Sequence, residues 1–170
     1  NLTNAKRILN NANVDLKTQE HVLSELTRIG YSKSLAGIRP ITKEGQIVSD
    51  ADMCDASGVN GFIRCYKYNV NHGGVLFDKN SFPVLNMSAE EYREKDRRSD
   101  NFINHFFEKM FKLYGLLLTS AGKKEGTRRY EFMIIFLEQF FEEQGCADWK
   151  AYLKNYIRRQ RTSVSTKATL

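Results

Sequence analysis

The chain has 170 residues, which is the size of one domain with a single buried core. Its 41% hydrophobic and 12% aromatic content, with only two prolines, excludes disordered, collagen-like and disulfide-stapled chains. Much of the net charge of +6 lies at the C-terminal end, because Arg158, Arg159, Arg161 and Lys167 follow the last acidic residue, Asp148. We therefore treat residues 158–170 as a basic, disordered tail and do not expect a nucleic-acid partner.

The cysteines indicate a reducing compartment. Cys54, Cys65 and Cys146 are odd in number and widely separated, so they predict neither a disulfide framework nor a zinc site. In addition, no apolar run approaches the roughly 18 residues of a membrane span. We expect a cytoplasmic protein that does not act in a membrane.

The N-terminal half reads as a series of helices separated by glycines. Apolar residues recur at three and four positions, which is the period of a helix with one buried face. The expected helices cover residues 5–12, 18–29, 46–56 and 58–68. Gly30 ends the second of them, and residues 34–42, with Gly37 and Pro40, are expected to form a loop.

The C-terminal half begins with an irregular segment, residues 69–87, in which a short extended piece at 75–77 is compatible with the sequence. A long helix follows through Ile103 and Leu117, with Ser88 or Ser99 as its cap. Two more helices are expected over 127–144 and 149–157. The prediction is one all-α domain, residues 1–157, built as an orthogonal helical bundle.

Three carboxylates lie close together in the segment that contains Asp50, Asp52 and Asp55. Asp52 and Asp55 share one side of the expected helix, which also carries apolar residues. Carboxylates in an apolar environment need a cation or hydrogen bonds, so a metal or substrate site is one interpretation. The alternative is a solvated acidic face, because no His partner accompanies these residues.

A second polar group lies on the long helix, where His105, Lys109 and Lys112 are spaced by four and three residues. In a regular helix this spacing produces one row of mostly cationic side chains, which can bind phosphate oxygens. The alternative is an ordinary surface row beside Glu108.

An ordered series of segments resembles a bacterial, nucleotide pyrophosphohydrolase-like branch of the HD-domain phosphohydrolases. The series consists of 45–56 with Gly58 and Gly61, then 72–78, 104–113, 119–123 and 129–137. The resemblance extends over about residues 5–144 and is more specific than any one of its motifs. It implies an all-helical HD-like fold and a metal-dependent hydrolase of nucleotides or related phosphate esters.

The resemblance also implies a site. Members of the family hold a divalent cation, such as Mn²⁺ or Mg²⁺, with a His, a His-Asp pair and a downstream Asp. That Asp corresponds to Asp52, which would be the catalytic metal ligand, with Asp50 and Asp55 supporting it. His105, Lys109 and Lys112 would then face the substrate phosphates.

The chain departs from this pattern because none of His21, His72 and His105 is followed by Asp. Ser24 also stands where relatives often have His. We therefore expect the C-terminal portion of an HD-type enzyme, without the N-terminal helices and inactive by itself, with the metal weakly bound or absent. The alternative is an inactive helical module that binds a nucleotide or a protein. The sequence leaves open whether the protein forms a homo-oligomer.

Overall fold

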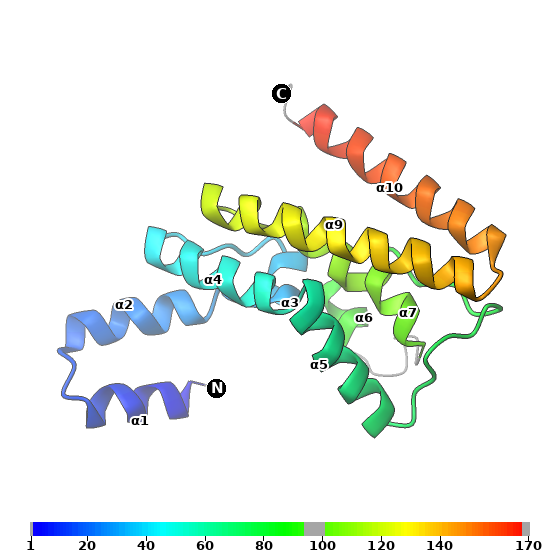
Figure 1. The fold of residues 1–170 in the computed structure, drawn as a ribbon. Helices are drawn as coiled ribbons and strands as arrows, with labels where there is room; N and C mark the ends of the chain where they lie inside the picture. Colours follow the sequence, from blue (N-terminus) through cyan, green and yellow to red (C-terminus); the bar gives the residue numbers. More distant parts are fainter. Residues whose placement is uncertain (1, 94–100, 168–170) are drawn as a thin grey trace.

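The computed structural model describes residues 2–93 and 101–167, and the side chains of residues 2–92 and 101–160. The regular elements of these residues are all helices, and an isolated bridge between Val75 and Asn101 stands in place of any strand (Figure 1). The expected all-α class is confirmed. None of the described helices is long and apolar enough to cross a membrane.

The N-terminal half contains α1 (Thr3–Asn11), α2 (Leu16–Leu26), α3 (Tyr31–Leu35), α4 (Lys43–Asp55) and α5 (Gly58–Asn71). Asp15 caps α2 and Thr42 caps α4, because each side chain accepts a hydrogen bond from a backbone N–H three residues later. The short helix α3 differs from the sequence prediction, which ended the helical segment at Gly30. Gly30 has a φ of 118° and redirects the chain into α3.

The C-terminal half contains α6 (Ala89–Arg93), α7 (Phe102–His105), the π-helical turn η2 (Phe106–Met110), α8 (Phe111–Tyr114), α9 (Ser120–Glu143) and α10 (Ala147–Lys167). Ser88 caps α6: its hydroxyl accepts from Glu91 N–H, and the Glu91 carboxylate accepts from Ser88 N–H. Asn101, and not Ser88, caps α7. Ser99, the other cap that we considered, lies outside the described residues.

The last helix is longer than the sequence predicted. Helix α10 continues past residue 157, where we place the domain boundary, and its backbone is helical to Lys167. This differs from the disordered tail that we expected over 158–170, although residues 168–170 lie outside the described part. Because the first part of α10 already packs against α9, further helical turns can be added without a new nucleation step.

The main core lies where α7, η2 and α8 pack against α9 and α10 (Figure 1). It is mostly aromatic, and its fully buried side chains include Phe106, Phe107, Leu137 and Phe141. Burial of each such side chain stabilises the fold by roughly 1.5–3 kcal/mol. This core fixes the helix that carries His105 and Lys109.

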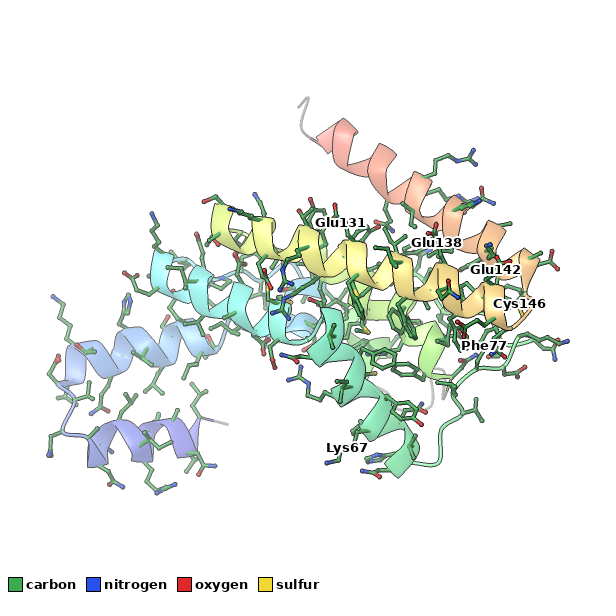
Figure 2. The ribbon with its side chains drawn as sticks, viewed as in Figure 1. Lys67, Phe77, Glu131, Glu138, Glu142 and Cys146 are labelled. Carbon is green, nitrogen blue, oxygen red and sulfur yellow. The ribbon has the colours of Figure 1, made fainter. Side chains whose placement is uncertain are left out.

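The irregular segment between α5 and α6 is fastened to the core. Phe102 N–H donates to Val75 O at 2.9 Å, and the Trp149 indole N–H donates to Lys79 O at 3.0 Å. Phe77 lies beside the α9–α10 corner, where its ring contacts Phe140 and Trp149 (Figure 2). The segment is therefore held by backbone and ring contacts on both sides.

Candidate functional site

The three aspartates of α4 have different environments. Asp50 is 3% exposed, and its carboxylate accepts hydrogen bonds from Leu118 N–H at 2.9 Å and from the N–H and hydroxyl of Thr119 at 2.7 Å each. These donors stand at the N-terminus of α9, where backbone N–H groups have no partner inside the helix. Asp50 therefore joins α4 to α9 as a helix cap.

Asp52 and Asp55 lie on the exposed side of α4. Asp55 forms an ion pair with Arg64 of α5. Within the residues that the structure describes, no three His, Cys, Asp or Glu side chains are close enough together to hold a metal ion. The described part of the chain thus does not fit the divalent cation of the family, and the metal role of Asp52 stays a prediction.

The cationic row of the long helix is interrupted by the π turn. A π turn holds one residue more than an α turn, so the following residues are rotated by about 100°, the angle of one helical residue. His105 and Lys109 line one cavity, but Lys112 does not. The Lys112 ammonium instead donates to Leu85 O. The expected three-residue row is therefore reduced to His105 and Lys109.

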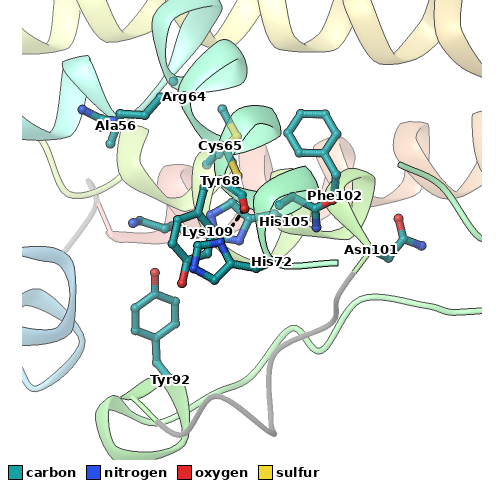
Figure 3. Close-up of a pocket in the computed structure, with 13 residues that line it drawn as sticks. Ala56, Arg64, Cys65, Tyr68, His72, Tyr92, Asn101, Phe102, His105 and Lys109 are labelled. Atoms are coloured by element: carbon teal, nitrogen blue, oxygen red, sulfur yellow. Dashed lines mark hydrogen bonds between the residues drawn. The ribbon is translucent and has the colours of Figure 1, made fainter. Parts of the chain in front are cut away.

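The cavity that contains His105 and Lys109 has a volume of about 500 Å³ and lies between α5, α6 and α7 with η2 (Figure 3). Arg64 and His72 of α5 also line it, so four side chains that carry or can acquire positive charge meet at one space. No Asp or Glu is among the described lining residues, so Asp52 does not line the cavity. The cavity is therefore suited to an anion.

Aromatic rings complete the cavity wall. The His72 ring stacks on Tyr68 with centroids 3.9 Å apart, and His72 Nδ1 lies 2.7 Å from Tyr68 O (Figure 3). The Lys109 ammonium lies 5.4 Å from the Tyr31 ring centroid and 5.6 Å from that of Tyr92. These cation–π contacts hold the Lys109 side chain at the cavity.

Cys65 also lines the cavity, but its thiol is not activated as a nucleophile. Burial raises the pKa of its thiol to about 11, although Lys109 and Arg64 favour the thiolate. The group is therefore a thiol at neutral pH. The described lining of the cavity is therefore cationic, and Cys65 does not give it an activated nucleophile.

The sequence reasoning missed two residues of this cavity, Arg64 and His72. The sequence analysis placed His72 in the irregular segment 69–87, but it caps the C-terminus of α5 and stacks one turn above Tyr68. The four-residue spacing of two rings at a helix end was a usable signal. Arg64 gave no such signal, because its place depends on how α5 packs against α7.

No protein-family model matches this chain. A search of curated proteins matches the uncharacterized protein YpgQ of Bacillus subtilis, with 23% identity over 127 residues, 74% of this chain and 53% of YpgQ. The chain thus spans about half the length of that relative.

Solved structures match over most of the chain. A Lactobacillus plantarum protein is 33% identical with a TM-score of 0.73, over 84% of this chain and 66% of that one. An HD-superfamily hydrolase from Bacillus thuringiensis is 29% identical with a TM-score of 0.60, over 85% and 62%. YpgQ in complex with ADP is 19% identical with a TM-score of 0.61, over 84% and 61%. Together with the all-helical architecture, these neighbours show that the chain has an HD-domain fold.

Proposed function

We propose that this chain belongs to an HD-type phosphohydrolase and that its cavity binds the phosphate groups of a nucleotide or a related phosphate ester. The observation that carries the proposal is the convergence of Arg64, His72, His105 and Lys109 on one cavity without an acidic residue in its described wall. Guanidinium and ammonium groups make charge-assisted hydrogen bonds to phosphate oxygens. The rings of Tyr68 and Tyr92 offer flat surfaces for a base.

Two comparisons support this reading. The Bacillus thuringiensis neighbour is an HD-superfamily hydrolase, and YpgQ has been crystallised with ADP. Transfer of nucleotide binding to this chain is our proposal, because the structural comparison with the ADP complex of YpgQ gives an identity of 19%. We also propose a cytoplasmic location, since Cys54, Cys65 and Cys146 are free thiols.

The hydrolytic part of the proposal concerns the whole protein. In the whole protein, the divalent cation of the family would supply polarisation of a phosphoryl group and a lower pKa for a bound water. We propose Asp52 as one of its ligands. Because the described residues do not form the rest of such a site, we expect the 170 residues alone to be inactive.

Calorimetric titration with ADP tests the binding function. We expect Lys109→Gln to weaken ADP binding by about tenfold or more, because a hydrogen bond to a charged group contributes roughly 1.5–3 kcal/mol. Lys67→Gln is the matched control, since Lys67 lies on the exposed side of α5 and does not line the cavity (Figure 2). If both substitutions weakened ADP binding equally, the affinity would come from the general positive charge of the chain. The cavity would then not be a specific phosphate site.

A second candidate function is an inactive helical module that binds a nucleotide or a protein. It is favoured by the hydrogen-bonded capping role of Asp50 and by the lack of a metal-binding group among the described residues. The protein made from the complete coding sequence distinguishes the two. Hydrolysis of nucleoside triphosphates with Mn²⁺ or Mg²⁺, lost in Asp52→Asn, supports the enzyme. ADP binding without turnover supports the module.

A further inference from the structure

Two buried tyrosine hydroxyls contact the π turn from different helices. The Tyr31 hydroxyl of α3 donates to Glu108 O at 3.2 Å, and the Tyr156 hydroxyl of α10 donates to Phe107 O at 3.1 Å. Burial raises the pKa of both tyrosines, so both hydroxyls keep the proton that they donate. A carbonyl oxygen has two lone pairs and can accept such a bond in addition to a backbone one. Both tyrosines therefore help to fix the backbone of η2.

The Tyr31 ring also contacts two residues of the cavity wall. The Lys109 ammonium lies 5.4 Å from its centroid, and the Tyr92 ring of α6 meets it edge to face, with centroids 4.8 Å apart. Lys109 and Tyr92 line the cavity, whereas Tyr31 is not among its described lining residues (Figure 3). Tyr31 therefore stands behind the wall and supports it from there.

Tyr31 reaches this place through the turn at Gly30. The φ of Gly30, 118°, lies in the region that favours glycine, and it directs the chain from α2 into α3. Helix α3 then packs against α6, which carries Tyr92. Tyr31 and Glu108 are 77 residues apart in the sequence, so no local spacing indicates their contact.

We propose that Tyr31 is a positioning residue of the anion site and that it acts through Lys109. Its hydroxyl anchors the ring to the turn, and its ring holds the ammonium at the cavity. A lysine side chain loses rotamer freedom when it binds an anion, and a ring that already holds the ammonium reduces this loss. The assignment rests on the proposed function, because it concerns a cation that would bind phosphate.

Calorimetric titration with ADP tests the role of the ring. Tyr31→Leu removes the ring and the hydroxyl, and we expect it to weaken ADP binding by about fivefold or more. Tyr31→Phe keeps the ring, so we expect it to change the affinity by less than about twofold. In the Lys109→Gln background, Tyr31→Leu should have no further effect on ADP affinity, since Tyr31 acts through Lys109.

Tyr156→Leu is the matched control for the loss of a buried tyrosine. It removes the hydroxyl bond to the adjacent carbonyl, Phe107 O, but the Tyr156 ring contacts Phe107 and Phe111 of the main core. Both Leu variants should lower the urea midpoint of unfolding. We expect Tyr156→Leu to change ADP affinity by less than about twofold, so that loss of stability and loss of binding are separated.

A second measurement needs no ligand. Reductive methylation with ¹³C-formaldehyde gives each lysine an NMR signal, and Lys109→Gln identifies the signal of Lys109. We expect this signal to lie upfield of that of the exposed Lys67, because the Lys109 ammonium lies over the rings of Tyr31 and Tyr92. Tyr31→Phe should keep the upfield shift and Tyr31→Leu should reduce it. A Lys109 signal at the position of the Lys67 signal would overturn the proposal even if Tyr31→Leu did not fold.

The binding results distinguish failure of this proposal from failure of the proposed function. If the unsubstituted chain does not bind ADP, or if Lys109→Gln binds it equally well, the proposed function is wrong and so is the role of Tyr31. If Lys109→Gln weakens binding but Tyr31→Leu does not, only the role of Tyr31 is wrong. The same conclusion follows if Tyr156→Leu weakens binding as much as Tyr31→Leu, because Tyr31 would then be a structural residue alone.

Discussion

Asp50 on α4 accepts hydrogen bonds from both the backbone N–H and the hydroxyl of Thr119, at 2.7 Å each. This link joins two helices that are far apart in the chain. Asp50→Asn keeps the size of the side chain but removes its charge and one acceptor. We expect it to lower the free energy of unfolding by about 1.5–3 kcal/mol, the range for hydrogen bonds to charged groups.

Urea denaturation followed by circular dichroism measures this change. Asp52→Asn is the control, because it makes the same substitution on the exposed side of the same helix. We expect it to alter the free energy of unfolding by less than about 0.5 kcal/mol. If the two variants were equally stable, the helix-capping role of Asp50 would be wrong.

Because Gly122 has no side chain, the Asp50 carboxylate has room to lie against the start of α9. A Cβ at this position would lie 2.2 Å from Asp50 Oδ2, whereas a Cβ at Gly115 would have its nearest neighbour at 3.6 Å. We expect Gly122→Ala to destabilise the fold by about 1–3 kcal/mol. Gly115→Ala should be neutral or slightly stabilising, since alanine restricts the unfolded chain. Thermal unfolding of the two variants checks the contrast, and a loss of equal size in both would contradict it.

Lys112 provides a test of the π turn. It belongs to the predicted row, but its ammonium contacts Leu85 O, and burial lowers its pKa in spite of Glu108 nearby. We therefore expect Lys112→Gln to change ADP affinity by less than about twofold, in contrast to Lys109→Gln. Titration calorimetry of the two variants gives the comparison. A weakening by Lys112→Gln as large as that by Lys109→Gln would restore the original row.

Glu125 gives the chain a specific sensitivity to acid. Hydrogen bonds from Arg128 and Arg129 lower its pKa from an ordinary 4.5 to about 2. A carboxylate with a lowered pKa in the folded state contributes stability above its ordinary pKa and loses it as the pH falls towards the folded value. Between pH 4.5 and 2, Glu125→Gln should therefore lose less stability than the unsubstituted chain.

Chemical denaturation at a series of pH values measures this difference. Glu138→Gln serves as a control, because Glu138 is an exposed residue of the same helix. Its stability should follow the unsubstituted chain through the same pH range. Parallel curves for all three proteins would show that the pairing of Glu125 with Arg128 and Arg129 makes no difference to folding.

Metal binding by the 170-residue chain should be weak. Asp52 alone cannot replace the His ligands that fix a transition-type metal, and the described residues form no larger group. We expect little heat on titration with Mn²⁺ and the same melting temperature with Mn²⁺ or with a chelator. Tight binding together with turnover of nucleoside triphosphates would show that other ligands complete the site.

The sequence was most informative about the helices that have one buried face. Apolar periodicity located α4, α9 and α10, because packing of a regular helix onto a core requires that pattern. It placed the start of α9 several residues late, at about Thr127. The segment from Ser120 is stabilised by Thr119 as its cap and by Asp50, and the second of these contacts is not local in sequence.

The candidate site was harder to predict, because contacts that are not local in sequence bring some of its residues together. His105 and Lys109 could be recognised from their spacing, and both reach the cavity. Whether Asp52 acts with them stays a prediction. Arg64 enters the cavity only because α5 packs against α7 and α9, and its ion pair with Asp55 joins two helices. The sequence of Phe106–Met110 does not predict the π turn that displaces Lys112, since an ordinary α-helix would also accept these residues.

The π turn decides which residues after His105 face the core. If the same residues formed a regular i to i+4 ladder, α8 would be turned by about 100° relative to α7. Phe111 and Leu113, now buried, would leave their places in the core, while Lys112 would return to the side of His105. The cavity would then gain a cation only at the expense of the core, so the one additional residue in this turn keeps the core intact and leaves Lys112 outside the anion site.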